Sequence, residues 1–470
     1  MSKKLKYTLL AIVFILGYTS LSFELILLRQ LINFVGSNTI VTSIVISVIL
    51  LFLSLGYYIG STISVKKYTC RKIINCIVVL LAGWYVAACS YYIVGGFFYL
   101  LSGIKSSLGQ VMIISLTFSA LPSMGLGFIT SYFGRVIHHS NSDYTGRFMA
   151  VDTIGSVSGS LITTLVLMPL FGVSSATICL VALTTLVLVL VAKKKDRILA
   201  ILMFVLLTSG AAVVAEEHIL FDDRTVMLDN AIARVDIFDD DFENGEPQSK
   251  WMYINGCISS IISEHEDLMA PYIRYVNKVF LDNLPQDKVH NILVLGAGGF
   301  TAGINDKRNN YIFLDIIKQL PEISEKHFLP EPISPNKKFI AQDAYLYMLR
   351  SEEKFDFIFL DVFSSTRNVP TNFVTADFFM LIKNHLTDDG VMVANVITSP
   401  SFKSKYAKRI DNTLRYVFKH SLSRQVVTDE TPNPYSDEWR NILYVYYNNA
   451  EAEEDNTIYT IDKNSAVFGQ

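Results

Sequence analysis

The chain has 470 residues and a net charge of −3, which gives no sign of the basic surface that nucleic-acid binding needs. Hydrophobic residues make up 51% of it, and the mean hydropathy of +0.36 is too high for a purely soluble protein. The five cysteines show no CxxC pair, no Cys/His cluster and no disulfide framework, so neither a zinc site nor a disulfide-stapled scaffold is expected.

Long apolar runs concentrate in residues 1–215, and we predict a transmembrane domain of about seven helices there. The segments are 8–28, 40–64, 74–98, 108–133, 149–170, 174–192 and 198–215. The first lacks a small-residue cleavage site, so we interpret it as a retained anchor. Gly56-x-x-x-Gly60 and Gly155-x-x-x-Gly159 have the spacing that lets helices pack closely in lipid.

Lysine and arginine residues gather before the first segment and in every second loop after it, which predicts a cytoplasmic N-terminus in a multi-pass protein of the cell membrane. Seven crossings would then place residues 216–470 on the extracytoplasmic side. One re-entrant segment would return them to the cytoplasm. The charge bias favours the extracytoplasmic side but leaves the side of the soluble part open.

Two acidic residues, Glu24 and Asp152, lie within the apolar segments. Charges in lipid are costly and usually face the interior of a helix bundle. Glu24 could pair with Arg29, and Asp152 could stabilise a helix start, where the helix dipole favours an anion. The alternative is a polar substrate or proton site inside the bundle.

The next part, residues 216–289, is expected to hold a linker, a small β-meander and a connecting helix. Strands are predicted at 233–238, 250–253 and 258–262, with the acidic run 239–247 as a turn or loop. Asn255-Gly256 is a hairpin signal. Residues 268–283 have helical spacing.

Residues 290–450 alternate strands with helices, which predicts a doubly wound, mostly parallel sheet of Rossmann-like type, followed by a tail at 451–470. The strands are 291–295, 311–315, 338–341, 355–361, 390–397 and 440–447. Ligands of such sheets bind outside the carboxyl ends of the strands. The informative residues are therefore those that end strands: Gly296, Asp315, Asp343 and Asp361.

A glycine-rich turn, Gly296-Ala297-Gly298-Gly299, follows the first of these strands, and Asp315 ends the second. Glycines let the backbone approach a nucleotide, and an acid at this distance can hold ribose hydroxyls. The third glycine of the dinucleotide pattern is replaced by Thr301, and GxG with a spaced acid also suits S-adenosylmethionine-type ligands. An ordinary strand turn remains the alternative.

Asp343 could accept a hydrogen bond from an adenine amine, or it could cap a helix. Asp361 could orient or deprotonate an attacking amine, or it could make an ordinary cap or loop hydrogen bond. The polar segment 362–370 that follows Asp361 could form a lid over the crevice.

These residues resemble a known family. Tyr253-Ile254-Asn255-Gly256, Leu295–Gly299, Leu314-Asp315, Gln342-Asp343-Ala344 and Phe355–Asp361 resemble the spermidine synthases, the polyamine aminopropyltransferases. Ser22–Arg29, Gly56–Gly60 and Arg147–Gly159 are similar to the helical half of membrane-fused spermidine synthase-like proteins. The resemblance implies a multi-pass helical domain joined to a β-meander and a Rossmann-like, S-adenosylmethionine-dependent transferase sheet.

By this resemblance, the cofactor is decarboxylated S-adenosylmethionine or S-adenosylmethionine, held by Gly296, Gly298, Asp315, Asp343 and Ala344. Asp361 would be the catalytic acid, and Tyr253, Ser364 and Ser365 would contact the substrate. No metal is implied. The partners would be a small amine or polyamine and the lipid bilayer, with a homodimer left open as the assembly.

The chain departs from the family where a polyamine would bind. The family's turn carries an acid where this chain has Gly299-Phe300, and its second catalytic-loop acid is replaced by Phe363-Ser364-Ser365. We therefore expect an aminopropyltransferase-like enzyme of polyamine biosynthesis with an altered acceptor pocket. The alternatives are a different S-adenosylmethionine-dependent transfer, such as methylation of a membrane-associated substrate, and a non-catalytic nucleoside- or polyamine-binding transporter or sensor.

Overall fold

A computed structural model describes residues 3–35, 39–63, 69–104, 106–140, 144–215, 224–242, 246–263, 269–362, 371–419, 422–427 and 439–449. The chain forms two compact units. The first unit comprises Met1–Met269, Gln319–Glu331 and Phe363–Pro370, and the second comprises Ala270–Lys318, Pro332–Val362 and Thr371–Gln470.

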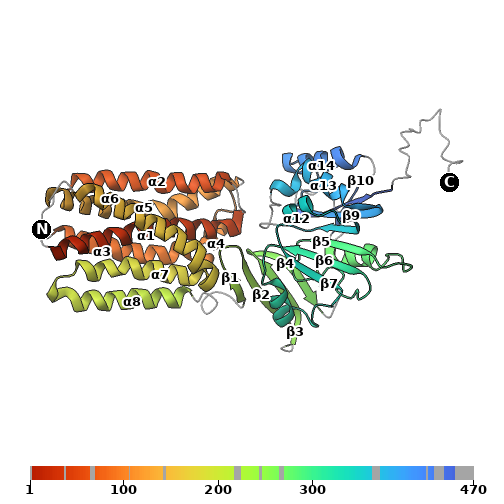
Figure 1. Ribbon diagram of the computed structural model, residues 1–470, viewed down its shortest axis with the longest axis horizontal. Coiled ribbons are helices and arrows are strands. Elements are labelled where there is room, and N and C mark those ends of the chain that lie inside the picture. Colours follow the sequence, from red (N-terminus) through yellow and green to blue (C-terminus); the bar gives the residue numbers. More distant parts are fainter. Residues whose placement is uncertain are drawn as a thin grey trace. The chain divides into compact units, whose positions relative to one another are not determined.

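The first unit contains a bundle of long apolar helices that run side by side (Figure 1). Its helices are α1 (Lys3–Val35), α2 (Thr39–Thr62), α3 (Thr69–Cys89), α4 (Tyr91–Leu100), α5 (Ser107–Ser140), α6 (Thr145–Ile162), α7 (Met168–Val191) and α8 (Arg197–Ala215). Among the described residues, six helical segments are long and apolar enough to cross a membrane.

The predicted segments 149–170 and 174–192 fall within one helical stretch, Thr145–Val191, because α6 continues through a π-helical turn, Thr163–Leu167, into α7. That stretch is interrupted at Gly172, whose φ of 84° is rarely adopted by residues with a side chain. The predicted segment 74–98 is divided between α3 and α4 at Ser90, whose hydroxyl accepts a hydrogen bond from the Ile93 N–H.

Glycines bring two pairs of helices into backbone contact. A Cβ on Gly56 of α2 would lie 2.2 Å from the Met124 carbonyl oxygen of α5. A Cβ on Gly159 of α6 would lie 2.2 Å from the Tyr18 carbonyl oxygen of α1. The close packing that both GxxxG patterns predict is therefore confirmed.

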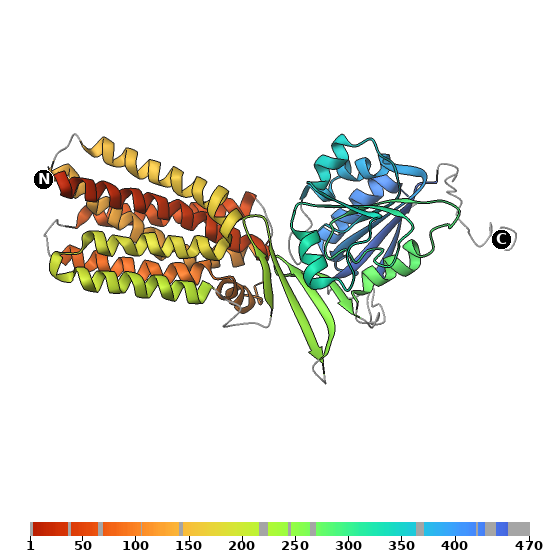
Figure 2. The same ribbon diagram turned by 60° about the horizontal axis from the view of Figure 1, so that its bottom comes forward.

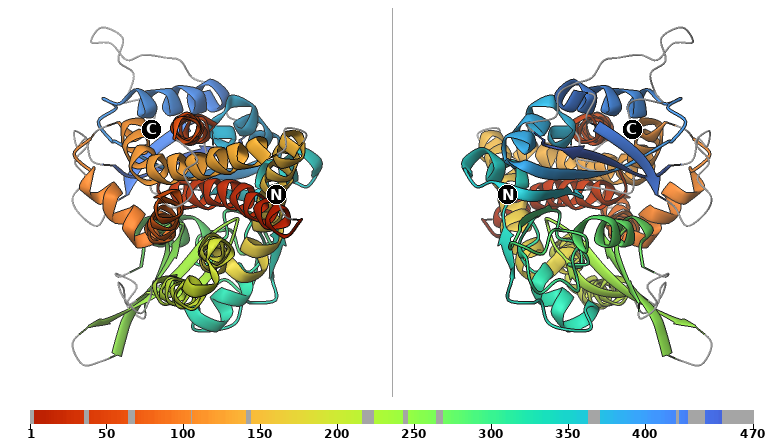
Figure 3. Two further views of the ribbon diagram at one scale, coloured as in Figure 1. Left: turned by 90° about the vertical axis from the view of Figure 1, so that its left-hand side faces the viewer. Right: turned by 90° about the vertical axis from the view of Figure 1, so that its right-hand side faces the viewer.

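A four-stranded antiparallel meander completes the first unit, with strands in the order β1 (Thr225–Asp229), β2 (Arg234–Phe242), β3 (Glu246–Ile254) and β4 (Cys257–Ser263). Asn255 and Gly256, with φ of 51° and 74°, form the predicted tight hairpin. Much of the acidic run 239–247 is not a loop, because β2 and β3 continue through it as a two-stranded arm (Figures 2 and 3).

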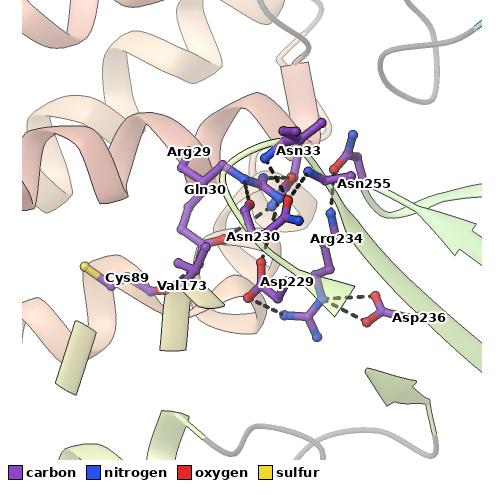
Figure 4. Close-up of polar contacts among 12 residues, drawn as sticks. Arg29, Gln30, Asn33, Cys89, Val173, Asp229, Asn230, Arg234, Asp236 and Asn255 are labelled. Carbon is purple, nitrogen blue, oxygen red and sulfur yellow. Dashed lines mark hydrogen bonds and ion pairs between the residues drawn. The ribbon is translucent and has the colours of Figure 1, made fainter. Parts of the chain in front are cut away.

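A buried polar network joins β1 and β2 to α1 (Figure 4). The Arg29 Nε donates to the Asn230 carbonyl at 2.6 Å, and its Nη2 lies 3.7 Å from Asp229. Arg234 donates through Nε to Asp236 at 3.0 Å. The suggested pairing of Arg29 with Glu24 is wrong, because five residues along a helix place the two side chains on different faces.

The second unit holds a seven-stranded sheet in the order β10-β11-β9-β8-β5-β6-β7. Its strands are β5 (Asn291–Leu295), β6 (Asn310–Asp315), β7 (Lys337–Ala341), β8 (Phe355–Leu360), β9 (Leu386–Thr398), β10 (Leu422–Val427) and β11 (Arg440–Tyr447). Strands β5 to β9 are parallel, and β11 pairs antiparallel with both β9 and the edge strand β10. The predicted sheet is thus present, with an unpredicted strand, β10, at its edge.

Helices cover both faces of this sheet. They are α10 (Pro271–Tyr275) with a π-helical turn (Val276–Leu281), α12 (Ala344–Arg350), α13 (Ala376–Asn384) and α14 (Lys405–Phe418). The last three lie on one face (Figure 1), where Phe379 of α13 meets Phe418 of α14. The segment with α11 (Leu320–Ile323) and a π-helical turn (Ser324–Phe328) belongs to the first unit.

Candidate functional site

Three strand ends meet at the carboxyl edge of the parallel sheet. Leu295, the last residue of β5, pairs with Leu314 of β6 on one side and with Leu360 of β8 on the other. Gly296 follows Leu295, Asp315 ends β6, and Asp361 follows Leu360. The fold therefore places these three residues on adjacent strands at the edge where ligands of doubly wound sheets bind.

Gly296 lets the ends of β5 and β8 approach each other. It has a φ of 94°, and a Cβ there would lie 2.3 Å from the Asp361 carbonyl oxygen. The Asp361 N–H donates to the Leu295 carbonyl at 2.8 Å, and the Gly296 N–H donates to the Leu314 carbonyl at 2.9 Å. Only glycine fits this position without moving Asp361.

The residues after Gly296 in this turn are held by glycine geometry and by the Asn277 side chain. Gly298 has a φ of 48°, which again favours glycine. Thr301, which stands at the third glycine position, is buried, and its carbonyl accepts from Asn277 Nδ2 at 3.1 Å. Asn277 also accepts from the Gly303 N–H at 2.8 Å, so this one side chain holds the segment from Thr301 to Gly303.

Asp315 already binds the backbone of the turn. Its Oδ2 accepts from the Ala297 N–H at 3.2 Å, and its Oδ1 accepts from the Ile317 N–H at 3.0 Å. Burial raises the pKa of the Asp315 carboxyl, and these backbone hydrogen bonds partly oppose that rise. A carboxylate can accept about four hydrogen bonds, so Asp315 keeps some acceptor capacity for a ribose diol.

Asp361 is held by two side-chain donors. The Tyr272 hydroxyl donates to Oδ2 at 3.0 Å, and Asn395 Nδ2 donates to Oδ1 at 2.9 Å. Burial raises the pKa of Asp361 to about 6, while both hydrogen bonds act to lower it. A carboxylate with that pKa is mostly ionised at neutral pH yet more basic than an exposed aspartate, which suits a general base.

Asp343 and Ala344 begin α12 beyond β7. The Asp343 Oδ1 accepts from the Leu346 N–H at 2.9 Å, so the helix-cap alternative is realised for one of its oxygens. Ala344 is buried as the first residue of that helix. Both lie at the same edge of the sheet as Asp315, which pairs with Ala341 of β7.

The remaining candidate residues belong to the first unit or fall outside the described residues. Tyr253 belongs to β3 of the first unit, stacked on Trp251 with Arg224 over its ring. Ser364 and Ser365 fall outside the described residues, as does the suggested lid at 363–370. Glu24 and Asp152 are both half-buried. Asp152 is not near a helix start as expected, since α6 begins two turns earlier at Thr145.

Sequence reasoning missed Tyr272 and Asn395. Asn395 carries a signal, since it is a polar residue, 2% exposed, between the fully buried Ala394 and Val396 of β9. Buried amides are hydrogen-bonded, so such a residue next to a strand-end acid predicts a partner. Tyr272 carries no such signal, because only the fold brings its helix to β8.

Comparison with known families matches residues 314–443 to the spermine/spermidine synthase domain. The mostly parallel sheet, with helices on its faces and an antiparallel β11, is a Rossmann-like α/β fold. The C-terminal part of this chain carries a spermidine synthase domain. The domain match includes Asp315, Asp343 and Asp361, and begins at Leu314 near the end of β6, so the glycine turn lies before it.

Curated relatives of the spermidine synthase domain are polyamine aminopropyltransferases. That of Vibrio vulnificus is 29% identical over 154 residues, 31% of this chain and 50% of the relative, so the chain spans about half the length of this relative. Polyamine aminopropyltransferase 2 of Aquifex aeolicus is 22% identical over 81% of this chain and 77% of its own length. Polyamine aminopropyltransferase 1 of Streptomyces coelicolor is 21% identical over 87% and 79%.

Solved structures similar to this chain include a probable spermidine synthase from Corynebacterium glutamicum and the spermidine synthase of Thermotoga maritima. The first is 21% identical, covers 48% of this chain and 80% of its own, and has a TM-score of 0.39. The second is 17% identical, covers 46% and 70%, and has a TM-score of 0.33.

Proposed function

We propose that this protein is a membrane-bound aminopropyltransferase that moves the aminopropyl group of decarboxylated S-adenosylmethionine to an amine acceptor. One observation carries the proposal: Gly296, Asp315 and Asp361 stand at the ends of adjacent strands, the spermidine synthase domain match includes both acids, and the Asp361 carboxylate lies between two donors. Gly296 and Gly298 admit the adenosine, Asp315 holds the ribose, and Asp343 and Ala344 line the adenine side.

The reaction needs a deprotonated amine in line with the leaving thioether. The amine nitrogen attacks the aminopropyl carbon beside the sulfonium, a C–N bond forms, and the C–S bond breaks with its electron pair going to sulfur. Methylthioadenosine leaves, and Asp361 takes the proton of the attacking amine. The rate acceleration comes from positioning of the reactants and from proton transfer, without a covalent enzyme intermediate.

The acceptor pocket is proposed to differ from that of an ordinary putrescine enzyme. Phe300 stands beside the place of the family's turn acid, with 2% exposure and its ring centroid 5.0 Å from that of Phe313 and 5.8 Å from that of Phe339. A cationic diamine favours carboxylates in its pocket. An apolar ring packed into the sheet supports an acceptor with fewer positive charges or an apolar portion, with Tyr253, Ser364 and Ser365 as candidate contacts.

The membrane location is part of the same proposal. Within the described part of the first unit, six helical segments meet the length and hydropathy of membrane spans, and both GxxxG patterns lie in them. We assign residues 1–215 to the membrane, residues 216–289 to the linker and meander, and residues 290–450 to the transferase domain. A reporter fused at Gln470 tests on which side of the membrane that domain lies.

The function is tested with the full chain reconstituted in lipid nanodiscs. Decarboxylated S-adenosylmethionine is supplied with putrescine, cadaverine, agmatine, spermidine or an alkylamine, and methylthioadenosine release is measured, with Asp361→Asn as the inactive control. Release with any amine supports the proposal. Release of S-adenosylhomocysteine from S-adenosylmethionine instead would indicate methyl transfer, and binding of neither sulfonium would overturn the enzymatic assignment in favour of a transporter or sensor.

A further inference from the structure

A row of two asparagines continues from Asp361 into the sheet. Asn395 Nδ2 donates to Asp361 Oδ1 at 2.9 Å, and Asn441 Nδ2 donates to Asn395 Oδ1 at 3.0 Å. Asn395 lies in β9 opposite Leu443 of β11, and Asn441 lies two residues along β11, opposite Ile397. Diagonal neighbours on an antiparallel pair share one face, so the two amides meet there.

The hydrogen bonds of this row fix which way the Asn395 amide group is oriented. An asparagine side chain accepts through oxygen and donates through nitrogen. Because the Asn395 oxygen accepts from Asn441, its NH₂ group must face the carboxylate. The opposite orientation would place the Asn395 oxygen against Asp361 and its nitrogen against the nitrogen of Asn441, which are two repulsive contacts.

We propose that Asn395 and Asn441 are positioning residues that fix the orientation of the Asp361 carboxylate and keep it an ionised acceptor for the amine proton. The inference rests on the proposed function, in which Asp361 is the general base. Asn441 does not touch Asp361 and acts through Asn395. If the two asparagines served only to hydrogen-bond each other within the sheet, their substitution would not change the ionisation of Asp361.

The ionisation of Asp361 depends on few groups. Among the described residues, Tyr272 is the titratable group that acts on it, from α10, and Asn395 is the other donor, from β9. Loss of the Asn395 donor leaves Tyr272 alone to stabilise the charge. Hydrogen bonds to a charged group change its equilibrium by about tenfold or more, so the effect is measurable.

The test compares Asn395→Ala, Asn441→Ala and Asn441→Asp in the full chain in nanodiscs. Asn441→Asp keeps the shape of the side chain and loses the donor when ionised, but it adds a negative charge, so Asn441→Ala is the decisive variant of the two. Asn310→Ala is the matched control, because Asn310 Nδ2 donates to Asn291 Oδ1 at 3.2 Å in the same sheet, at the amino end of β6. Two readouts are taken: methylthioadenosine release against pH, and an infrared pH titration of the Asp361 carboxyl, identified by subtraction of Asp361→Asn.

We expect Asn395→Ala to lower kcat/KM about tenfold at pH 6.5, with most of the loss recovered at pH 8.5. Asn441→Ala and Asn441→Asp should move the profile in the same direction, and Asn310→Ala should leave it unchanged. An equal loss at every pH with an unmoved infrared titration would overturn the positioning role. If the infrared titration moves but the parent protein releases no methylthioadenosine, the positioning pair stands and the proposed reaction fails.

Discussion

The Tyr272 hydroxyl donates a hydrogen bond to Oδ2 of Asp361 at 3.0 Å, although 89 residues separate the two in the chain. Burial and the neighbouring carboxylate raise the pKa of Tyr272 well above its usual range, so the hydroxyl keeps its proton at any working pH. The tyrosine is thus a permanent donor, and Asp361 receives one donor on each oxygen.

Replacement of Tyr272 by phenylalanine should shift activity to higher pH. The hydrogen bond lowers the pKa of Asp361, so its loss raises that pKa further above about 6 and reduces the ionised base at neutral pH. We expect kcat/KM at pH 7 to fall about tenfold and to recover in part at pH 8.5. Methylthioadenosine release across that range measures it.

The control for Tyr272→Phe is Tyr275→Phe, on the same short helix. The Tyr275 hydroxyl donates to Gln425 of β10 rather than to Asp361. It should leave the pH profile in place. An unchanged profile for Tyr272→Phe as well would show that the tyrosine does not act on the base.

Gly296→Ala should abolish binding of any adenosyl ligand. The residue has a φ of 94°, and the added methyl group would lie 2.3 Å from the Asp361 carbonyl oxygen, so the ends of β5 and β8 must separate. Backbone strain of this kind costs about 1–3 kcal/mol before the clash is counted. Calorimetric titration with decarboxylated S-adenosylmethionine measures the loss. Gly83→Ala, where nothing lies within 4 Å of the new Cβ, serves as control and should bind like the parent.

Asp315→Asn should weaken adenosyl binding while Asp361→Asn should not. Both Asp315 oxygens accept backbone N–H groups, so alanine would also release the turn, whereas asparagine keeps one acceptor and the shape. The amide loses the second acceptor and the charge that favour a ribose diol, and we expect affinity to fall at least about tenfold. Equal affinities of Asp315→Asn and parent in calorimetry would remove the ribose assignment.

The sequence predicts the part of the site that local chemistry dictates. A glycine turn after an apolar strand, and acids at the ends of the next strands, are sufficient to place Gly296, Asp315 and Asp361 at one edge, because strand order then follows from the βαβ rule. The donors to Asp361 do not follow in this way. Tyr272 and Asn395 come from a helix and a strand that only tertiary packing brings together.

The misses in the fold have similar causes. Leu422–Val427 is an edge strand with polar residues on it, and its pairing with β11 rather than its own pattern makes it a strand. The acidic residues Asp239–Asp241 read as a loop, yet cross-strand pairing with β3 extends them. Glu24 is the acid nearest to Arg29 in sequence, whereas the fold supplies Asp229 from β1 as its partner.

Asp229→Asn should destabilise the first unit. Asp229 lies 3.7 Å from Arg29 and 3.9 Å from Arg234, and both arginines are at most 6% exposed at the side chain. Asparagine removes the negative charge that partly neutralises the two buried guanidinium groups. Breaking a buried ion pair costs about 3–5 kcal/mol. Thermal unfolding in nanodiscs should show a clear decrease in Tm. Asp239→Asn, whose ion pair with Lys250 is exposed, should change Tm little, and an equal decrease would contradict the role of the network.

Asp361→Asn should raise stability at neutral pH and leave it nearly unchanged in acid. The carboxyl has a folded-state pKa of about 6 against an ordinary value of 3.8, so between these pH values the folded chain binds more protons than the unfolded chain. Stability contributed by this group is therefore present below pH 4 and lost as the pH rises to about 6, by about 3 kcal/mol at most.

Asparagine has no such loss, and it fits the site, since its oxygen can accept from Asn395 while its nitrogen donates to the Tyr272 hydroxyl. Tm of the variant minus Tm of the parent, measured from pH 4 to pH 7.5, should rise by a few degrees. A flat difference for Asp361→Asn would mean that the carboxyl is ionised at little cost, and the case for Asp361 as a base tuned by burial would fail.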